Sequence, residues 1–163
     1  MAVRTLRIEG DPILNKKTKE VKELTPRLEE LIDDMIETMN VENGVGIAAP
    51  QVGVLRKIFI VDIGEGTYVF INPEILETEG EQVGDEGCLS VPGKVGTVVR
   101  PEKVKIKALG RDMQPFELEA EGFFARAICH ENDHLEGVLY SSKTTGGLRD
   151  VPMEDDEEEP EIE

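Results

Sequence analysis

The spacing of hydrophobic residues predicts two helices. In the first, apolar positions recur every three or four residues, as on one face of an α-helix: they are Leu28, Leu31, Ile32, Met35, Ile36 and Met39. Thr25 is expected to be the N-cap and Pro26 the first helical residue. A second helix is predicted from about Phe123 to Glu136, closed by Gly137 just beyond its end.

Short segments rich in β-branched and aromatic residues lie between the two helices and predict strands. These segments run from Lys57 to Ile63, from Thr67 to Asn72, from Val104 to Leu109 and from Phe116 to Ala120. The last two alternate apolar with charged residues, as half-buried strands do. Two helices that flank a set of strands predict an α+β domain.

Length and composition are compatible with that prediction. The chain has 163 residues, of which 39% are hydrophobic and 33% charged, so one compact domain can form. No uninterrupted apolar run exceeds four residues, whereas a membrane-spanning helix needs about 20. The N-terminal residues also lack the apolar segment of a secretory signal peptide. We therefore expect neither membrane insertion nor secretion by that route.

The charge balance is strongly acidic and uneven. The chain carries 18 basic and 35 acidic residues, a formal net charge of −17, and eight of the acids lie in residues 154–163. Residues 1–153 still have a net charge of −9, so no electrostatic attraction for nucleic acid phosphates is expected. We expect a single domain over residues 1–151, followed by a solvated, disordered segment at 152–163. The two cysteines are expected to be reduced thiols of a cytoplasmic protein.

Both histidines of the chain fall in one pentapeptide, His130-Glu131-Asn132-Asp133-His134. Residues four apart on a helix share a face, so the two imidazoles can bind one metal ion. Glu131 can then reach a metal-bound water, whose pKa a divalent ion lowers toward ~7, and accept its proton. The motif predicts a hydrolytic metal site. The other interpretation is a pair of hydrogen-bonded histidines without a metal.

A catalytic metal site of this kind needs a third protein ligand. The metzincin pattern would place a histidine where this chain has Tyr140, and no third histidine exists. Glu154 is a gluzincin-like alternative, but it lies in the acidic C-terminal segment. Cys88 is the better candidate, because it stands in the glycine-containing sequence EGCLS and its thiolate would complete the set. Alternatively, it is simply a small buried residue.

A third segment, Gly44–Gln51, has the sequence GVGIAAPQ. It lacks the glycine spacing of dinucleotide-binding loops and the Gly-Lys-Ser/Thr of phosphate-binding loops. A tight turn is the simplest interpretation. Gln51 adds a chemical one, because its amide can donate a hydrogen bond to a developing oxyanion.

Taken together, the three segments resemble the motifs of peptide deformylases, metal hydrolases that remove the formyl group from the N-terminal methionine of new polypeptides. That family carries GxGxAAxQ, EGCLS and HExDH in this order, and this chain has GVGIAAPQ, EGCLS and HENDH. The similarity extends over residues 10–139. It implies mostly antiparallel strands around a central helix that carries HENDH, within a single catalytic domain.

The resemblance also implies the ligand set and the metal. Cys88, His130 and His134 would bind one divalent ion, expected to be Fe(II), with zinc, nickel or cobalt as alternatives. A ferrous site with a thiolate ligand is open to oxidation, so activity is expected to fade in air.

The catalytic groups implied by the resemblance are Glu131, as general base and then general acid, with two oxyanion donors, the Gln51 amide and the Leu89 backbone N–H. The substrate would be a formyl-methionyl nascent peptide that pairs with the first motif as an added strand. The residues expected to contact it are Val45, Gly46, Gly87, Phe123 and Ala127. A monomer is expected, with transient ribosome association.

Two departures from the family lie near the C-terminus. Ser142 stands where many relatives have aspartate, and the chain ends in acidic residues instead of a basic helix. Ribosome docking through a basic helix is therefore not expected. Two other functions remain open: a catalytically inactive metal-binding homologue, and a zincin-type peptidase. The missing third histidine and the presence of Gln51 argue against the peptidase.

Overall fold

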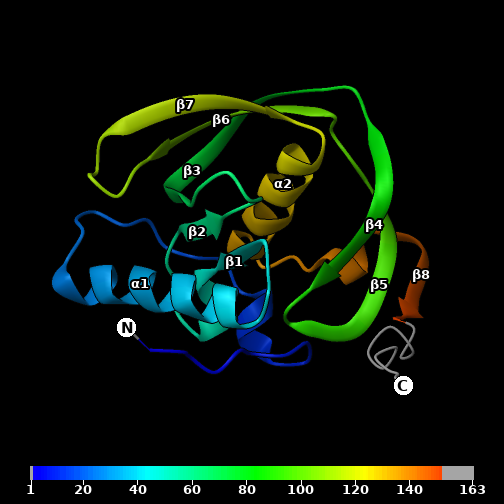
Figure 1. Ribbon diagram of the computed structural model, residues 1–163, viewed down its shortest axis with the longest axis horizontal. Coiled ribbons are helices and arrows are strands. Elements are labelled where there is room, and N and C mark those ends of the chain that lie inside the picture. Colours follow the sequence, from blue (N-terminus) through cyan, green and yellow to red (C-terminus); the bar gives the residue numbers. More distant parts are fainter. Residues whose placement is uncertain (1, 152–163) are drawn as a thin grey trace, which may run out of the picture.

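The computed structural model of the chain describes residues 2–151 (Figure 1). The prediction for residues 152–163 lies outside this range. Within it there are two α-helices, α1 (Pro26–Val41) and α2 (Phe123–Leu135), and three short 3₁₀ helices, η1 (Pro12–Asn15), η2 (Ala49–Val52) and η3 (Tyr140–Ser142). Among the described residues, no helix has both the length and the apolar character needed to cross a membrane.

The strands form two sheets in which every neighbouring pair is antiparallel. The five-stranded sheet has the order β1-β2-β3-β6-β7, with bounds Gly46–Ala48, Ile58–Val61, Tyr68–Glu79, Lys103–Leu109 and Pro115–Glu121. The three-stranded sheet has the order β4-β5-β8, with bounds Gln82–Cys88, Val91–Arg100 and Thr144–Asp150.

Helix α2 lies at the centre of the molecule. In Figure 1 it is enclosed by the arc of β3, β6 and β7, by β4 and β5, and by β1 and β2, and it contacts β1, β2, β5 and β7. The expected α+β fold, mostly antiparallel strands around a central helix with the HENDH sequence, is confirmed.

Strand β2 shows why the core is built on two sides. Ile58 and Ile60 belong to the apolar cluster that contains Met35 of α1. Phe59, between them, belongs to the cluster that contains Ile128 of α2. Successive residues of a strand point to opposite faces, so a strand covered by helices on both sides reads as an unbroken apolar run.

The ends of both helices follow their sequence signals. The Thr25 hydroxyl accepts a hydrogen bond from the backbone N–H of Leu28 at 3.2 Å, which confirms the predicted cap of α1. Gly137 follows α2 with φ of +80°, as expected of a residue just beyond a helix. A Cβ at this position would also lie 2.7 Å from the backbone of Asn15, so only glycine fits the turn.

The strand predictions were incomplete. The strand predicted to end at Asn72 continues to Glu79, because a register shift in the pairing of β3 with β6 lets it pass an Asn72 with φ of +51°. The short strand β1 was not predicted, because Gly44–Gln51 was interpreted as a tight turn. Strands β4, β5 and β8 were missed as well. Their glycines and charged residues carry a weak local β signal, and they are strands because they pair with one another.

Candidate active site

The three motifs meet in one cavity of about 440 Å³. Residues of the first motif come from β1 and η2, those of the second from the end of β4, and those of the third from α2. The lining residues that carry chemistry are Gln51, Cys88, Leu89, His130 and Glu131. This convergence brings together segments far apart in the sequence.

Cys88, His130 and His134 are close enough to bind one metal ion, since their ligand atoms all lie within 4.8 Å of one another. Within residues 2–151 no other cluster of three or more histidine, cysteine or acidic side chains is arranged in this way. The Cys88 sulfur lies 3.4 Å from Nε2 of His134. One thiolate and two imidazoles, from a strand end and one face of a helix, make the set of three protein ligands that a catalytic metal site needs. The chemistry and spacing of these donors fit a divalent metal ion.

The ring of His130 is oriented by Glu86. Its Nδ1 lies 2.8 Å from Oε1 of Glu86. Burial alone would raise the pKa of Glu86, but hydrogen bonds from Arg100 and His130 lower it to about 2. An ionised carboxylate only accepts hydrogen bonds, so Nδ1 is the donor and Nε2 is left free to bind metal.

Glu86 is itself held by two buried arginines. Arg100 donates to both of its oxygens, from Nε at 2.8 Å and Nη2 at 2.9 Å, and Arg126 donates from Nη1 at 2.7 Å. Arg100 continues to Asp133 through Nη1 at 2.7 Å. The network ties the end of β5 to α2 and fixes the carboxylate that positions His130.

Burial lowers the pKa of His134 well below its usual value. The imidazole is therefore neutral at ordinary pH, and the neutral ring is the form that binds metals. Burial would also lower the pKa of His130, but its contacts with Cys88 and Glu86 raise it. A metal ion at this ring would displace a proton.

Glu131 is buried beside the ligand set and points toward β1. Burial raises its pKa to about 7, against the opposing effect of His130. Its Oε1 has no hydrogen-bond partner within residues 2–151. A carboxyl group with a pKa near neutrality, free to accept and return a proton, has the properties of a general base.

Gln51 is held in one orientation. Its Oε1 accepts a hydrogen bond from the backbone N–H of Ala48 at 2.9 Å. Its Nε2 lies 3.1 Å from the Ser90 hydroxyl and 3.6 Å from the Cys88 sulfur. The donor end of the amide therefore faces the ligand set, where it can stabilise negative charge on an oxygen.

The residues expected to contact substrate line the same cavity. Among them, Phe123 and Val45 are exposed at its mouth, with 55% and 40% of their surface accessible. The full set is Val45, Gly46, Gly87, Phe123 and Ala127. His134 is the one proposed site residue that does not line the cavity, since it lies beneath the other ligands with 1% of its surface exposed.

The sequence interpretation missed the residues that support the site. Glu86 opens the EGCLS motif and Asp133 lies within HENDH, so both carried a positional signal. Arg100 and Arg126 carried none, because only the packing of β5 and α2 brings them to Glu86. Ser142, the departure noted in the sequence, donates its hydroxyl to the Leu139 carbonyl at 2.9 Å.

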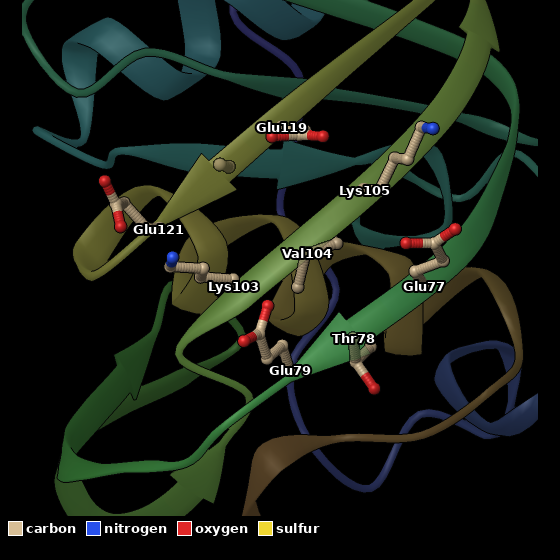
Figure 2. A pocket seen from close by; sticks show the side chains of 9 residues that line it. Glu77, Thr78, Glu79, Lys103, Val104, Lys105, Glu119 and Glu121 are labelled. Atoms are coloured by element: carbon tan, nitrogen blue, oxygen red, sulfur yellow. The ribbon is translucent and has the colours of Figure 1, made fainter.

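A larger hollow, of about 500 Å³, lies on the face of β3, β6 and β7 shown in Figure 2. Its side chains form two cross-strand rows, in each of which a lysine of β6 lies between two glutamates: Glu77, Lys105 and Glu119 in one row, and Glu79, Lys103 and Glu121 in the next. These charged side chains are largely exposed to solvent. The residues that line the hollow include no histidine or cysteine. The smaller cavity at Cys88 is therefore the candidate active site.

Comparison with known proteins identifies relatives along almost the whole chain. The family model described as polypeptide deformylase matches residues 3–148. The peptide deformylase of Agathobacter rectalis is 59% identical over 158 residues, which cover 97% of this chain and 100% of that protein. The peptide deformylase of Lachnoclostridium phytofermentans is 55% identical over 162 residues, covering 98% of this chain and 99% of that protein.

Solved structures show the same similarity in three dimensions. The crystal structure of a peptide deformylase from Legionella pneumophila has a TM-score of 0.86 and 42% identity, covering 89% of this chain and 88% of that one. A peptide deformylase from Synechococcus elongatus in complex with actinonin has a TM-score of 0.84 and 38% identity, covering 86% and 78%.

Proposed function

This chain belongs to the polypeptide deformylase family, and we propose that the cavity at Cys88 removes the formyl group from the N-terminal methionine of nascent polypeptides, with release of formate. The observation that carries the proposal is that Glu131 and Gln51 line the same cavity as Cys88 and His130, two members of the ligand set that His134 completes. A base, an oxyanion donor and a metal site together are what hydrolysis of an amide requires.

In this proposal Cys88, His130 and His134 hold one divalent ion. Such an ion polarises a carbonyl oxygen and lowers the pKa of water, which are the two contributions amide hydrolysis needs from it. Fe(II) is the proposed physiological ion, because a mixed set of thiolate and imidazole donors suits iron and zinc. Nickel or cobalt can take the place of these two metals in the same site. Metal analysis of anaerobically purified protein tests the identity of the ion.

The roles of the chain's own groups follow from their positions. Glu131 accepts a proton from the attacking water and returns it to the nitrogen of the leaving amine. The Gln51 Nε2 and the backbone N–H of Leu89 donate hydrogen bonds to the formyl oxygen as it becomes negative. These donors are fixed before the reaction, so no reorganisation is needed at that moment.

The geometry of β1 supports binding of an extended peptide. It is the edge strand of the five-stranded sheet and pairs only with β2 within the described residues. A substrate backbone can therefore pair with the free edge at Val45 and Gly46, as an added strand. The methionine side chain would then point toward Phe123 and Ala127, and Gly87, which lines the same cavity, would contact the peptide as well.

The proposal extends to where the protein works. Nascent chains emerge from ribosomes, so we place the activity in the cytoplasm, with residues 1–151 as one catalytic domain of a monomer. Association with the ribosome would be transient, because the acidic chain is repelled by ribosomal RNA phosphates. Co-sedimentation with ribosomes at low and high salt tests this part separately.

Formate release from formyl-Met-Ala-Ser, by protein prepared anaerobically with Fe(II), tests the reaction. The wild-type protein is expected to turn over, whereas Glu131→Ala keeps its metal and loses turnover. Protein that holds one metal ion per chain but releases no formate would contradict the proposal and favour an inactive homologue. Cleavage of internal bonds in unformylated peptides would instead indicate a peptidase.

A further inference from the structure

Arg126 lies in the wall of the candidate active site, and its guanidinium uses only part of its hydrogen-bonding capacity. Arg126 lines the cavity and is 5% exposed. Its Nη1 donates to Glu86 at 2.7 Å and its Nε to Gln82 at 3.3 Å. Its Nη2 is buried and has no hydrogen-bond partner within residues 2–151. A buried donor without an acceptor is costly, and a bound molecule that supplies one gains accordingly.

The neighbouring strand leaves room for this group. Gly84 of β4 lies opposite Arg126, and a Cβ at this position would be 3.2 Å from Nη2. A larger residue at position 84 would crowd the guanidinium. The absence of a side chain therefore leaves room for Nη2 between α2 and β4.

Other side chains in this part of the cavity offer no comparable donor. Ala127 follows Arg126 in the sequence, and Phe123 precedes it by about one turn of α2. Ala127 and Phe123 line the cavity together with Arg126. An apolar pocket of this kind recognises length and volume. It does not separate two side chains that differ only by a sulfur atom in place of a methylene group.

We propose that Arg126 is a specificity-determining residue that donates a hydrogen bond from Nη2 to the thioether sulfur of the substrate methionine. The inference rests on the proposed function, which directs that side chain toward Phe123 and Ala127. A thioether sulfur is a weak acceptor, whereas norleucine has the same length and no acceptor. The enzyme therefore prefers formyl-methionine to formyl-norleucine, although the two side chains fill the pocket equally.

A purely supporting role for Arg126 predicts a different result. Because Arg126 also holds Glu86, its removal lowers activity on every substrate. Such a general loss cancels in the ratio of kcat/KM for two substrates measured with the same protein. Only a contact with sulfur changes the ratio.

The test compares formyl-Met-Ala-Ser with formyl-norleucyl-Ala-Ser on the full-length, metal-loaded chain. The wild type is expected to prefer methionine roughly three- to tenfold, the effect of one modest hydrogen bond. Arg126→Leu brings the ratio to about one. Gly84→Ala keeps the arginine but crowds Nη2, and lowers the ratio partway. Val83→Ala, on the solvent-exposed side of the same strand, leaves the ratio unchanged.

Binding of the products gives a second readout that does not depend on turnover. Calorimetric titration with Met-Ala-Ser and norleucyl-Ala-Ser is expected to show the same preference in the wild type and its loss in Arg126→Leu. Equal kcat/KM and equal product affinity for methionine and norleucine in the wild type would overturn the assignment. A preference for methionine that survives in Arg126→Leu would overturn it too. Formate release from neither peptide would instead refute the proposed function, and the assignment with it.

Discussion

The carboxyl group of Glu131 packs directly against the backbone of Gly46. A Cβ added at Gly46 would lie 2.5 Å from Oε2 and 2.9 Å from Cδ of Glu131, closer than such atoms approach. The glycine of the first motif is therefore a condition for the position of the proposed general base on α2.

Gly46→Ala tests this relationship. The added methyl group is expected to displace the carboxyl group and to lower kcat/KM by roughly 100-fold, since a shift of about 1 Å at a catalytic group has an effect of that size. Formate release measures the loss, and metal content is expected to stay at the wild-type level. Full activity in this variant would show that Glu131 can act from another position.

Gln51→Glu tests the oxyanion donor. The new carboxylate can still accept the hydrogen bond from Ala48, but it replaces the Nε2 donor that faces the ligand set. A loss of roughly 10²- to 10³-fold in kcat is expected, with a smaller change in KM. Steady-state kinetics on formyl-Met-Ala-Ser separate the two constants. A change confined to KM would assign Gln51 to substrate binding instead.

Glu86→Gln is expected to weaken metal binding. The amide cannot hold His130 as a carboxylate does, and it leaves Arg100 and Arg126 without their shared counter-charge. Outer partners of metal ligands typically contribute 10- to 100-fold in affinity, so about that loss is expected. Competition with a chelator measures the affinity. Lys105→Met, which removes a charge from the face shown in Figure 2, is the matched control and should leave it unchanged.

Acid should destabilise the protein partly through Glu86. Its pKa falls from 4.5 to about 2 on folding, so its ionised form stabilises the folded state above pH 4.5, and this contribution disappears as the pH falls toward 2. The shift corresponds to about 3 kcal/mol of unfolding free energy. Urea denaturation of the metal-free protein over this range is expected to give a steeper pH dependence for wild type than for Glu86→Gln. Parallel curves would show that the carboxylate does not titrate in this way.

The two cysteines should differ in reactivity. Cys88 is partly exposed, whereas Cys129 is 6% exposed and burial raises its pKa to about 11. Alkylation at about pH 8 is expected to modify Cys88 only after metal is removed, because the reactive species is a free, accessible thiolate. Cys129 should stay unmodified in the folded protein. Mass spectrometry locates the label, and protection of Cys88 in metal-free protein would argue against its role as a ligand.

The sequence alone determined the local features of this protein. The apolar spacing in Leu28–Met39, with Thr25 before it, was sufficient to place α1 and its cap, and the spacing of His130 and His134 placed both imidazoles on one face of a helix. The order of the three motifs and the residues within them indicated the family. Each of these features depends on residues within a few positions of one another, whose backbone preferences and side-chain directions are set locally.

Only the tertiary structure decided the features that depend on distant residues. It brought Cys88 to within 3.4 Å of His134, Glu86 to Arg100 and His130, and Gly46 to Glu131. It also made strands of the glycine-rich and charged segments in β4, β5 and β8, which have little strand preference of their own. Strand pairing and side-chain contact across the core arise from packing between segments far apart in sequence, and no local pattern specifies them.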